Sequence, residues 1–143
     1  MICVDTSLAI QWLIAEQHSD KALALVANAG RARDRLVAPP SLPIEVSNVL
    51  RQRMRREALP LQEALDLLER FLQFDVSLLS PAGLHREALL LADGYGLPAT
   101  YDAHYLALAQ MLGCDFWTSD QRLITALGGQ LPFVKWIGDY QQP

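Results

Sequence analysis

Short apolar segments alternate with stretches of helical spacing along this chain, and that alternation constrains the fold more than any other feature. Five segments have the character of buried strands: residues 1–4, 36–38, 76–79, 115–118 and 133–137. Helical spacing is expected at about 8–16, 19–28, 41–58, 60–72, 82–93, 100–112 and 120–127. Strands that alternate with helices pair in parallel through crossovers, with helices on both faces of the sheet. The sequence therefore predicts an α/β fold, a three-layer α/β/α sandwich with a mainly parallel four- to five-stranded sheet.

Length and composition fit a single domain over residues 1–143. Apolar residues make up 51% of the chain and charged residues 20%, which excludes a disordered, tail-like protein. The apolar runs fall far short of the roughly 20 residues that a membrane span needs. No Lys or Arg precedes Lys21, so no secretory signal is expected. Cys3 and Cys114 lack CxxC spacing and are expected to be reduced thiols. We expect a cytoplasmic protein without membrane contact.

Helix-start and helix-stop signals place the expected elements more closely. Ser41 and Thr100 are expected to cap the helices that follow them, and Gly113 is expected to end the second of these. In the segment after Pro60 the leucines at 61, 65, 68 and 72 share one helical face with Ala64. In the segment from 19 to 28 the helical spacing falls on Leu23, Val26 and Ala27.

Four acidic residues stand at strand ends or helix starts. Asp5 follows the first strand and Asp120 follows the fourth, whereas Glu45 and Asp102 lie in the first turns of helices. In parallel α/β sheets the carboxyl ends of strands and the starts of the following helices meet at one edge, where binding sites form. Asp102 fits this rule if its helix enters at the same edge. The alternative is a purely structural role, since acidic residues are common at helix starts, where they cap the helix.

Four carboxylates at one edge would repel each other unless a cation lay between them. Hard divalent cations prefer oxygen ligands, and the absence of a His and Cys cluster argues against zinc. Mg²⁺ or Mn²⁺ held by carboxylates suits phosphoryl chemistry, in which the metal activates water. The net charge of −4 does not fit a protein that coats nucleic acid, yet four carboxylates in one site would leave the rest of the chain balanced.

Four sequence fragments resemble PIN-domain ribonucleases, in particular VapC-type toxins of toxin–antitoxin pairs. They begin with Val4-Asp5-Thr6-Ser7 and end with Trp117-Thr118-Ser119-Asp120-Gln121-Arg122-Leu123, and between these lie residues 42–50 and 101–109. Their order and spacing match over essentially the whole chain. The resemblance implies an endoribonuclease dependent on Mg²⁺ or Mn²⁺. It implies that Asp5, Glu45, Asp102 and Asp120 are catalytic carboxylates and metal ligands, with Asp5 and Asp102 as direct ligands.

The resemblance also assigns supporting roles to polar side chains beside the carboxylates. Thr118 would be a further catalytic residue that orients water, metal or phosphate, and Thr6 or Ser7 would do so less directly. Asn48 lies one turn from Glu45 and is a candidate substrate contact, or else an ordinary polar helix residue. RNA-phosphate contacts are expected from a basic run, which otherwise is a solvated helix end: Arg51, Arg53 and Arg55.

Partners follow from the same resemblance: an RNA substrate, a cognate antitoxin protein and a second copy of the chain in a homodimer. The rival interpretation is a catalytically silent module that keeps the PIN fold for binding proteins. Other enzyme classes lack their motifs. Position 7 is Ser, where a phosphatase with an Asp nucleophile needs a second Asp, and no GxGxxG, P-loop or GxSxG pattern occurs.

Overall fold

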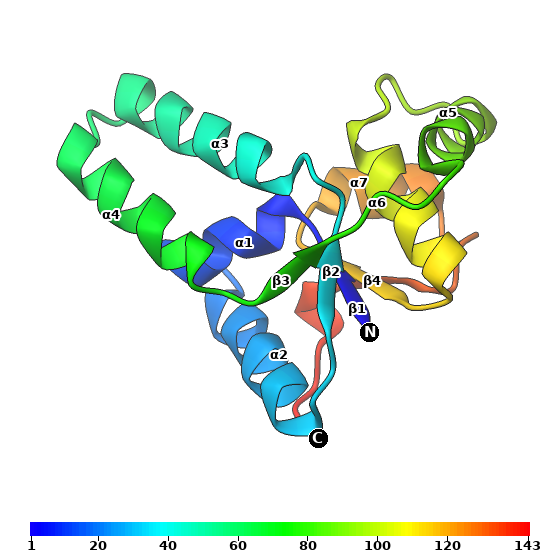
Figure 1. The fold of residues 1–143 in the computed structure, drawn as a ribbon, viewed down its shortest axis with the longest axis horizontal. Helices are drawn as coiled ribbons and strands as arrows, with labels where there is room; N and C mark the ends of the chain where they lie inside the picture. The colour runs from blue at the N-terminus through cyan, green and yellow to red at the C-terminus, as the bar shows by residue number, and fades with distance from the viewer.

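The computed structural model describes all 143 residues, and its five strands form one all-parallel sheet. The strands stand in the order β3-β2-β1-β4-β5 (Figure 1). Their bounds are β1 (Ile2–Val4), β2 (Leu36–Ala38), β3 (Val76–Leu78), β4 (Asp115–Thr118) and β5 (Val134–Trp136). The predicted α/β fold with a parallel sheet is therefore confirmed, with each strand within a residue or two of its expected place.

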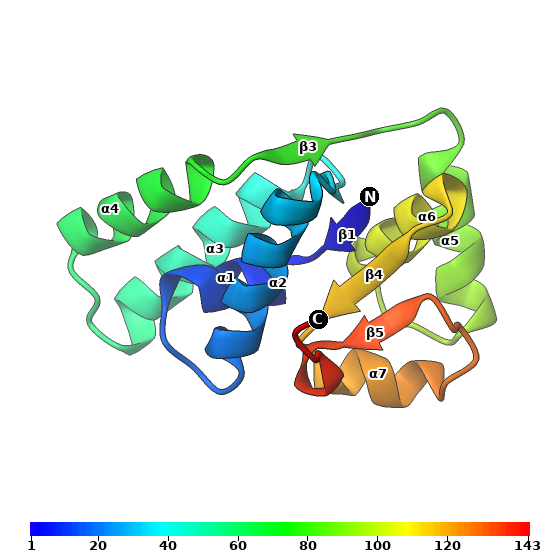
Figure 2. The same cartoon turned by 90° about the horizontal axis from the view of Figure 1, so that it is seen from below.

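Helices cover both faces of this sheet. Their bounds are α1 (Thr6–Leu13), α2 (Ser19–Ala32), α3 (Leu42–Arg56), α4 (Leu61–Leu72), α5 (Leu84–Gly94), α6 (Tyr101–Leu112) and α7 (Gln121–Leu127), followed by the 3₁₀ turn η1 (Ile137–Asp139). The pair α1–α2 and the pair α5–α6 lie on opposite sides of the sheet, and α3 and α4 project together as an arm (Figures 1 and 2). None of these helices combines the length and the apolar character that crossing a membrane demands.

The strand order reverses at β1. From β1 the chain builds outward through β2 to β3, and it then returns to place β4 and β5 on the other side of β1. Cys3 of β1 is opposite Val37 of β2 on one side and Phe116 of β4 on the other. Crossovers that leave such neighbouring strands in opposite directions open a crevice at the strands' carboxyl ends. The fold thus creates a site at the ends of β1 and β4, where the sequence predicted one.

The core is a single cluster of 31 buried residues that lies on both sides of the sheet. Trp12 of α1 and Tyr105 of α6 are among its largest fully buried side chains, together with Phe116 of the sheet. Burying one large apolar side chain contributes roughly 1.5–3 kcal/mol to stability. Because both faces are covered, β1 and β2 read as continuous apolar runs rather than as an alternating pattern.

Several helical details differ from the expectation. The first helix ends at Leu13, because Ile14 is extended, and α2 continues to Ala32. The buried face of α2 is formed by Ala22, Leu25 and Ala29. Of the three positions that the spacing singled out, Val26 is partly buried against the core, whereas the other two are exposed. Neither Ser41 nor Thr100 makes a side-chain capping bond. Ser41 instead donates its hydroxyl hydrogen to Glu45.

The apolar stripe on α4 is only partly covered. Ala64 and Phe71 are buried, whereas Leu61 is 61% exposed and Leu72 is 62% exposed. The reason is the position of the helix, since α4 packs on α3 and α1 in the projecting arm rather than across the sheet. A helical apolar stripe therefore predicted the helix correctly without indicating how much of the stripe the protein itself would cover.

Candidate active site

A pocket of about 310 Å³ opens at the carboxyl ends of β1 and β4. All four carboxylates that the sequence singled out line it: Asp5, Glu45, Asp102 and Asp120. They come from four different segments of the chain, as the ends of two strands and the starts of two helices require. Thr6 and Ser7 also line the pocket, as do Tyr105, Ser119, Glu16 and Arg53.

Asp5 forms the floor of the pocket and caps α1. Its Oδ1 atom accepts hydrogen bonds from the Leu8 backbone N–H at 3.1 Å and from the Ser7 hydroxyl at 2.5 Å. Its Oδ2 atom accepts from the Thr118 hydroxyl. The residue is 4% exposed, and burial raises the pKa of its carboxyl group from 3.8 to about 6, against the opposing effect of these hydrogen bonds.

Thr118 lies beneath the pocket rather than in its lining. It is fully buried at the end of β4, and its hydroxyl hydrogen is donated to Asp5. The same oxygen accepts the backbone N–H of Asp120 at 3.0 Å. The hydroxyl group therefore ties the two strand ends together, and this leaves it no hydrogen for a water or a substrate in the pocket.

Asp120 is fixed by the start of the next helix. As the N-cap residue of α7, it accepts the backbone N–H groups of Arg122 at 2.9 Å and Leu123 at 3.3 Å, both on Oδ1. Capping bonds of this kind satisfy helix-terminal N–H groups that would otherwise have no partner. The second carboxylate oxygen makes no hydrogen bond within the protein and remains available to the pocket.

Asp102 differs from both of these residues, because no group in the protein donates a hydrogen bond to its carboxylate. It lies in the first turn of α6, where the helix dipole favours negative charge. The pKa of its carboxyl group is nevertheless raised, first by burial and then by the charges of Asp120 and Glu45. Because Asp102 lines the pocket, the N-terminus of α6 lies at the edge of the sheet where β1 and β4 end.

Glu45 is held through a hydroxyl network that the sequence did not reveal. Its Oε2 atom accepts the Ser41 hydroxyl at 3.0 Å and the Tyr105 hydroxyl at 2.6 Å. The Thr6 hydroxyl in turn donates to the Tyr105 oxygen at 3.3 Å, since the phenolic hydrogen is already used. Burial and the bond to Glu45 raise the pKa of Tyr105 well above its usual range. Tyr105 follows Asp102 by three residues, so helical spacing was the signal for it.

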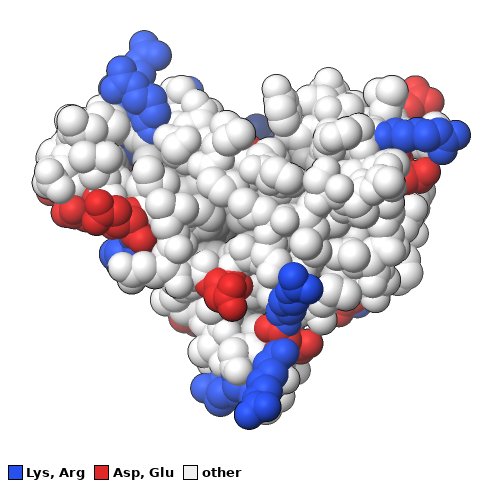
Figure 3. Space-filling model, viewed as in Figure 1, with Lys and Arg blue, Asp and Glu red and all other residues white.

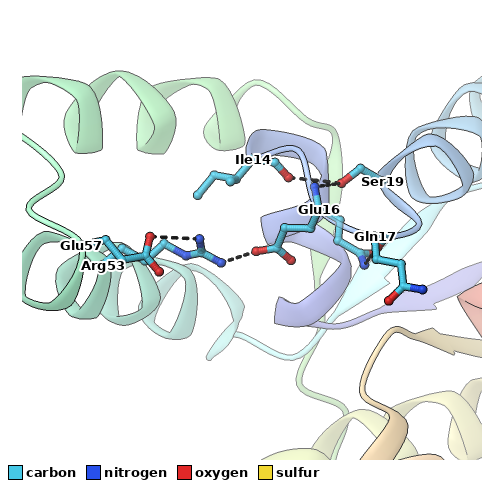
Figure 4. Close-up of polar contacts among 7 residues, drawn as sticks. Ile14, Glu16, Gln17, Ser19, Arg53 and Glu57 are labelled. Carbon is cyan, nitrogen blue, oxygen red and sulfur yellow. Dashed lines mark hydrogen bonds and ion pairs between the residues drawn. The ribbon is translucent and has the colours of Figure 1, made fainter.

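Arg53 is the one basic residue in the pocket lining. It pairs with Glu16, from the loop after α1, and with Glu57 at 3.4 Å (Figure 4). The Ser19 hydroxyl fixes that loop by accepting the Glu16 N–H at 2.9 Å and donating to the Ile14 carbonyl at 3.2 Å. The position of Glu16 in the pocket depends on this loop conformation, which no sequence pattern predicted.

Other predicted contacts lie outside the pocket. Asn48 is exposed and does not line it, because Val49 and Arg53, four and eight residues after Glu45, occupy that face of α3. Arg51 and Arg55 are exposed and do not line it either. In Figure 3 the basic side chains gather at the margins of the visible face, over α2, over α5 and over the arm, and its centre is mostly uncharged.

The charge of the pocket lining accounts for the charge of the whole chain. Five carboxylates and one guanidinium line the pocket, which gives it a formal charge of −4, equal to the net charge of the protein. No three His, Cys, Asp or Glu side chains lie close enough together to enclose a metal ion. The carboxylates instead surround open space, and such a donor set fits Mg²⁺ or Mn²⁺, which bind through one or two carboxylates and retain water. Zinc sites, by contrast, need His or Cys ligands.

Comparison with protein-family models matched the PIN domain over residues 2–127. The match contains all four of the carboxylates that the sequence singled out, from Asp5 to Asp120. A search of curated proteins found no significant match.

Proposed function

The chain belongs to the PIN-domain family, and from this premise we propose that it is a metal-dependent endoribonuclease that hydrolyses RNA phosphodiester bonds. PIN domains are generally nucleases that use divalent metal ions. The observation that carries the proposal is the convergence of four carboxylates in one pocket whose single arginine is already paired with two glutamates. These carboxylates repel one another, and a catalytically silent binding module has no need of such an arrangement.

Asp102 and Asp5 are the residues that would hold the ion, since Asp102 has no other partner and Asp5 is fixed in position by three donors. A bound Mg²⁺ or Mn²⁺ supplies an activated water and neutralises charge on the phosphate. Asp120 and Glu45 face the same space with carboxylate oxygens that can accept a hydrogen bond from a water molecule. The water oxygen forms a bond to phosphorus while the bond from phosphorus to the leaving ribose oxygen breaks.

The hydroxyl groups of the pocket act on the carboxylates rather than on the substrate. Ser7 and Thr118 each donate to Asp5, so they orient it and hold it in place. Tyr105 does the same for Glu45, and Thr6 supports Tyr105. Positioning of this kind matters because a catalytic group must stay within a fraction of an ångström of its productive place. Arg53 is the one cation of the lining, and a phosphate contact would require it to leave Glu16 or Glu57.

The activity is tested by incubating the purified protein with a pool of tRNA and rRNA in Mg²⁺, Mn²⁺ or EDTA, beside Asp5→Asn. We expect discrete fragments that require metal and that are absent with the variant. A thermal midpoint that ignores millimolar Mg²⁺ and Mn²⁺, together with no cleavage, would instead support the silent binding module, since a ligand that binds the folded state must raise its stability.

We also propose that the enzyme is the toxin of a toxin–antitoxin pair and that it forms a homodimer. The apolar side chains left exposed support such partners, because extended apolar surface marks protein contacts. On the arm they include Leu61 and Ile44, the latter 71% exposed, and on α5 they include Leu89, 64% exposed. Purification from its native host should return the chain with a second protein, and light scattering of the isolated chain should give twice its mass of 15.9 kDa.

A further inference from the structure

A second pocket, of about 340 Å³, adjoins the active-site pocket. The two share Glu16 and Ser119 in their linings, so they form one continuous depression. The second pocket extends beyond β4 toward β5, as the presence of Trp136 in its lining shows. Neighbouring strands lie about 4.8 Å apart. A nucleotide bound at the carboxylates would therefore bring the base of its neighbour within reach of this pocket.

The second pocket differs from the first in carrying amide groups rather than carboxylates. Its only acidic residue is Glu16, which is paired with Arg53. The side chains of Gln17 and Gln121 make no hydrogen bond within the protein, and neither does the imidazole of His18. The two amides donate and accept hydrogen bonds without charge, as the edges of nucleobases do.

Gln11 adds a buried polar atom that lacks a partner. The residue is 5% exposed, and its Nε2 atom donates to the Gln17 carbonyl at 2.8 Å. Its Oε1 atom is buried without any hydrogen bond. Buried polar atoms are nearly always paired, so an unpaired one in the lining of a pocket points to a ligand or a water molecule that completes it.

The aromatic side chain of the second pocket, Trp136, is held in place by its neighbours. The six-membered ring of Trp136 occupies the space beside Gly138, where an added Cβ atom would lie 2.3 Å from the ring. His18 meets the same indole edge-on, with ring centroids 5.3 Å apart and planes at 81°. His18 holds this position with φ of 68°, a left-handed conformation that is rare and strained for a residue with a side chain. A partly exposed, fixed aromatic side chain beside free amides is an arrangement suited to contact with one base.

We propose that this second pocket binds a single unpaired nucleobase of the RNA, next to the scissile phosphate, and that it contributes sequence preference at that position. The inference rests on the proposed nuclease function, because it takes RNA as the ligand. Trp136 provides the aromatic contact, and Gln121 and Gln17 provide the hydrogen bonds that read the base edge. The pocket is suited to a base rather than a phosphate because neither Lys nor Arg lines it.

The binding arm of the test uses the indole N–H signals of the three tryptophans, recorded in EDTA so that no metal ion contributes to binding. Each of the four ribonucleoside 5′-monophosphates is added in turn, with ribose 5-phosphate as the probe that lacks a base. We expect the Trp136 signal, assigned with Trp136→Phe, to move with at least one nucleotide and to stay still with ribose 5-phosphate. The signal of Trp12, which is 2% exposed, should not move.

The cleavage arm uses a random single-stranded RNA library with Mn²⁺ and compares the ends produced by the wild type and by Gln121→Ala. We expect the preference at one position beside the cut to fall about tenfold, within the range that one pair of side-chain–base hydrogen bonds contributes to discrimination. Gln110→Ala, an exposed glutamine of α6 outside the pocket, is the matched control and should keep the wild-type preference.

The two arms separate the inference from the function beneath it. If the nucleotides move the Trp136 signal but no RNA is cut, the base site is supported and the nuclease proposal fails. If RNA is cut while the Trp136 signal ignores all four nucleotides and Gln121→Ala keeps the wild-type preference, the base site is overturned and the nuclease proposal remains.

Discussion

The floor of the active-site pocket holds both of its carboxylates by hydrogen bonds, whereas one carboxylate of the wall, Asp102, has none. On the floor, at the ends of β1 and β4, Asp5 accepts three hydrogen bonds and Asp120 accepts two. On the wall, Asp102 of α6 accepts none, and burial together with the neighbouring charges raises its pKa. The floor residues therefore serve the fold as well as the site, since each caps a helix. Asp102 makes no hydrogen bond that serves the fold, and apart from the dipole of α6 only a bound cation would compensate its charge.

The substitution Asp102→Asn tests most directly whether Asp102 serves catalysis rather than the fold. We expect cleavage to fall about 10³-fold or more, because stabilisation by a metal ion contributes several kcal/mol to the transition state. The thermal midpoint in EDTA should rise, since the substitution removes repulsion without removing a hydrogen bond. Initial cleavage rates in Mn²⁺ and thermal unfolding in EDTA measure the two effects.

Asp115→Asn is the matched control for that substitution. Asp115 is exposed at the start of β4, at the edge of the sheet opposite the pocket, and its variant should cleave RNA as the wild type does. Full activity of Asp102→Asn would show that the carboxylate of Asp102 is not needed for catalysis. A lowered midpoint in EDTA would show that Asp102 has a structural partner after all.

A second prediction concerns pH and the floor. The pKa of Asp5 is about 6 in the folded protein and 3.8 ordinarily, so the folded state holds the proton more tightly than the unfolded chain does. In EDTA this group therefore contributes stability below pH 3.8 that is lost as the pH rises to about 6, roughly 3 kcal/mol in all. Asp5→Asn cannot titrate at this position and should lack this loss.

Urea unfolding of both proteins between pH 4 and pH 7 measures the difference. The free energy of unfolding of Asp5→Asn minus that of the wild type should grow with pH and then level off above pH 6. Saturating Mg²⁺ should shrink the difference near pH 7, because the ion stabilises the ionised form. A pH-independent difference in EDTA would mean that the hydrogen bonds to Asp5 fully offset its burial.

The contrast between floor and wall also marks what the sequence could predict. Asp5 follows its strand directly, Asp120 follows its strand after one residue, and both precede helices, so local pattern alone placed them at one edge. For Thr118 the resemblance implied a role in orienting water, metal or phosphate, whereas its hydroxyl group donates to Asp5. Thr118 stands two residues after the buried Phe116, so the period of a strand points both side chains to the same face, which is covered.

Long-range geometry accounts for what the sequence could not predict. Glu16 reaches the pocket only because the loop after α1 turns toward Arg53, a contact across 37 positions of the chain. Asn48 was placed one turn from Glu45, but the pocket lies along the i+4 row rather than the i+3 row of α3. The strand order, which places β4 beside β1, likewise follows from packing and not from any local motif.

The substitution Thr118→Val tests whether the Thr118 hydroxyl group holds Asp5 and Asp120 in place. The change keeps the shape of the side chain but removes both the donor to Asp5 and the acceptor for the Asp120 N–H. We expect a loss of about 1–3 kcal/mol in stability, the usual cost of leaving buried polar groups unpaired. Cleavage should fall about tenfold or more because both floor carboxylates lose a fixed point.

Thr125→Val provides the comparison, since the Thr125 hydroxyl bonds only to the Gln121 carbonyl on exposed α7. It should change neither quantity appreciably. If Thr118→Val retained full stability but lost all activity, the hydroxyl would act on substrate or water directly, and Thr118 would belong to the chemistry rather than to the support of Asp5.

The smallest expected effect belongs to Tyr105→Phe, which tests whether the wall is held as the floor is. The phenolic hydroxyl is the only link between α6 and Glu45, so its loss frees that carboxylate to move while Ser41 still holds one oxygen. We expect a stability change of about 1 kcal/mol, typical of one hydrogen bond, and a loss of cleavage smaller than that of Thr118→Val. Tyr101→Phe, at a side chain 69% exposed in the same helix, should leave both unchanged. An effect of Tyr105→Phe larger than that of Thr118→Val would reverse the comparison, because Glu45 would then depend on its support more than Asp5 does.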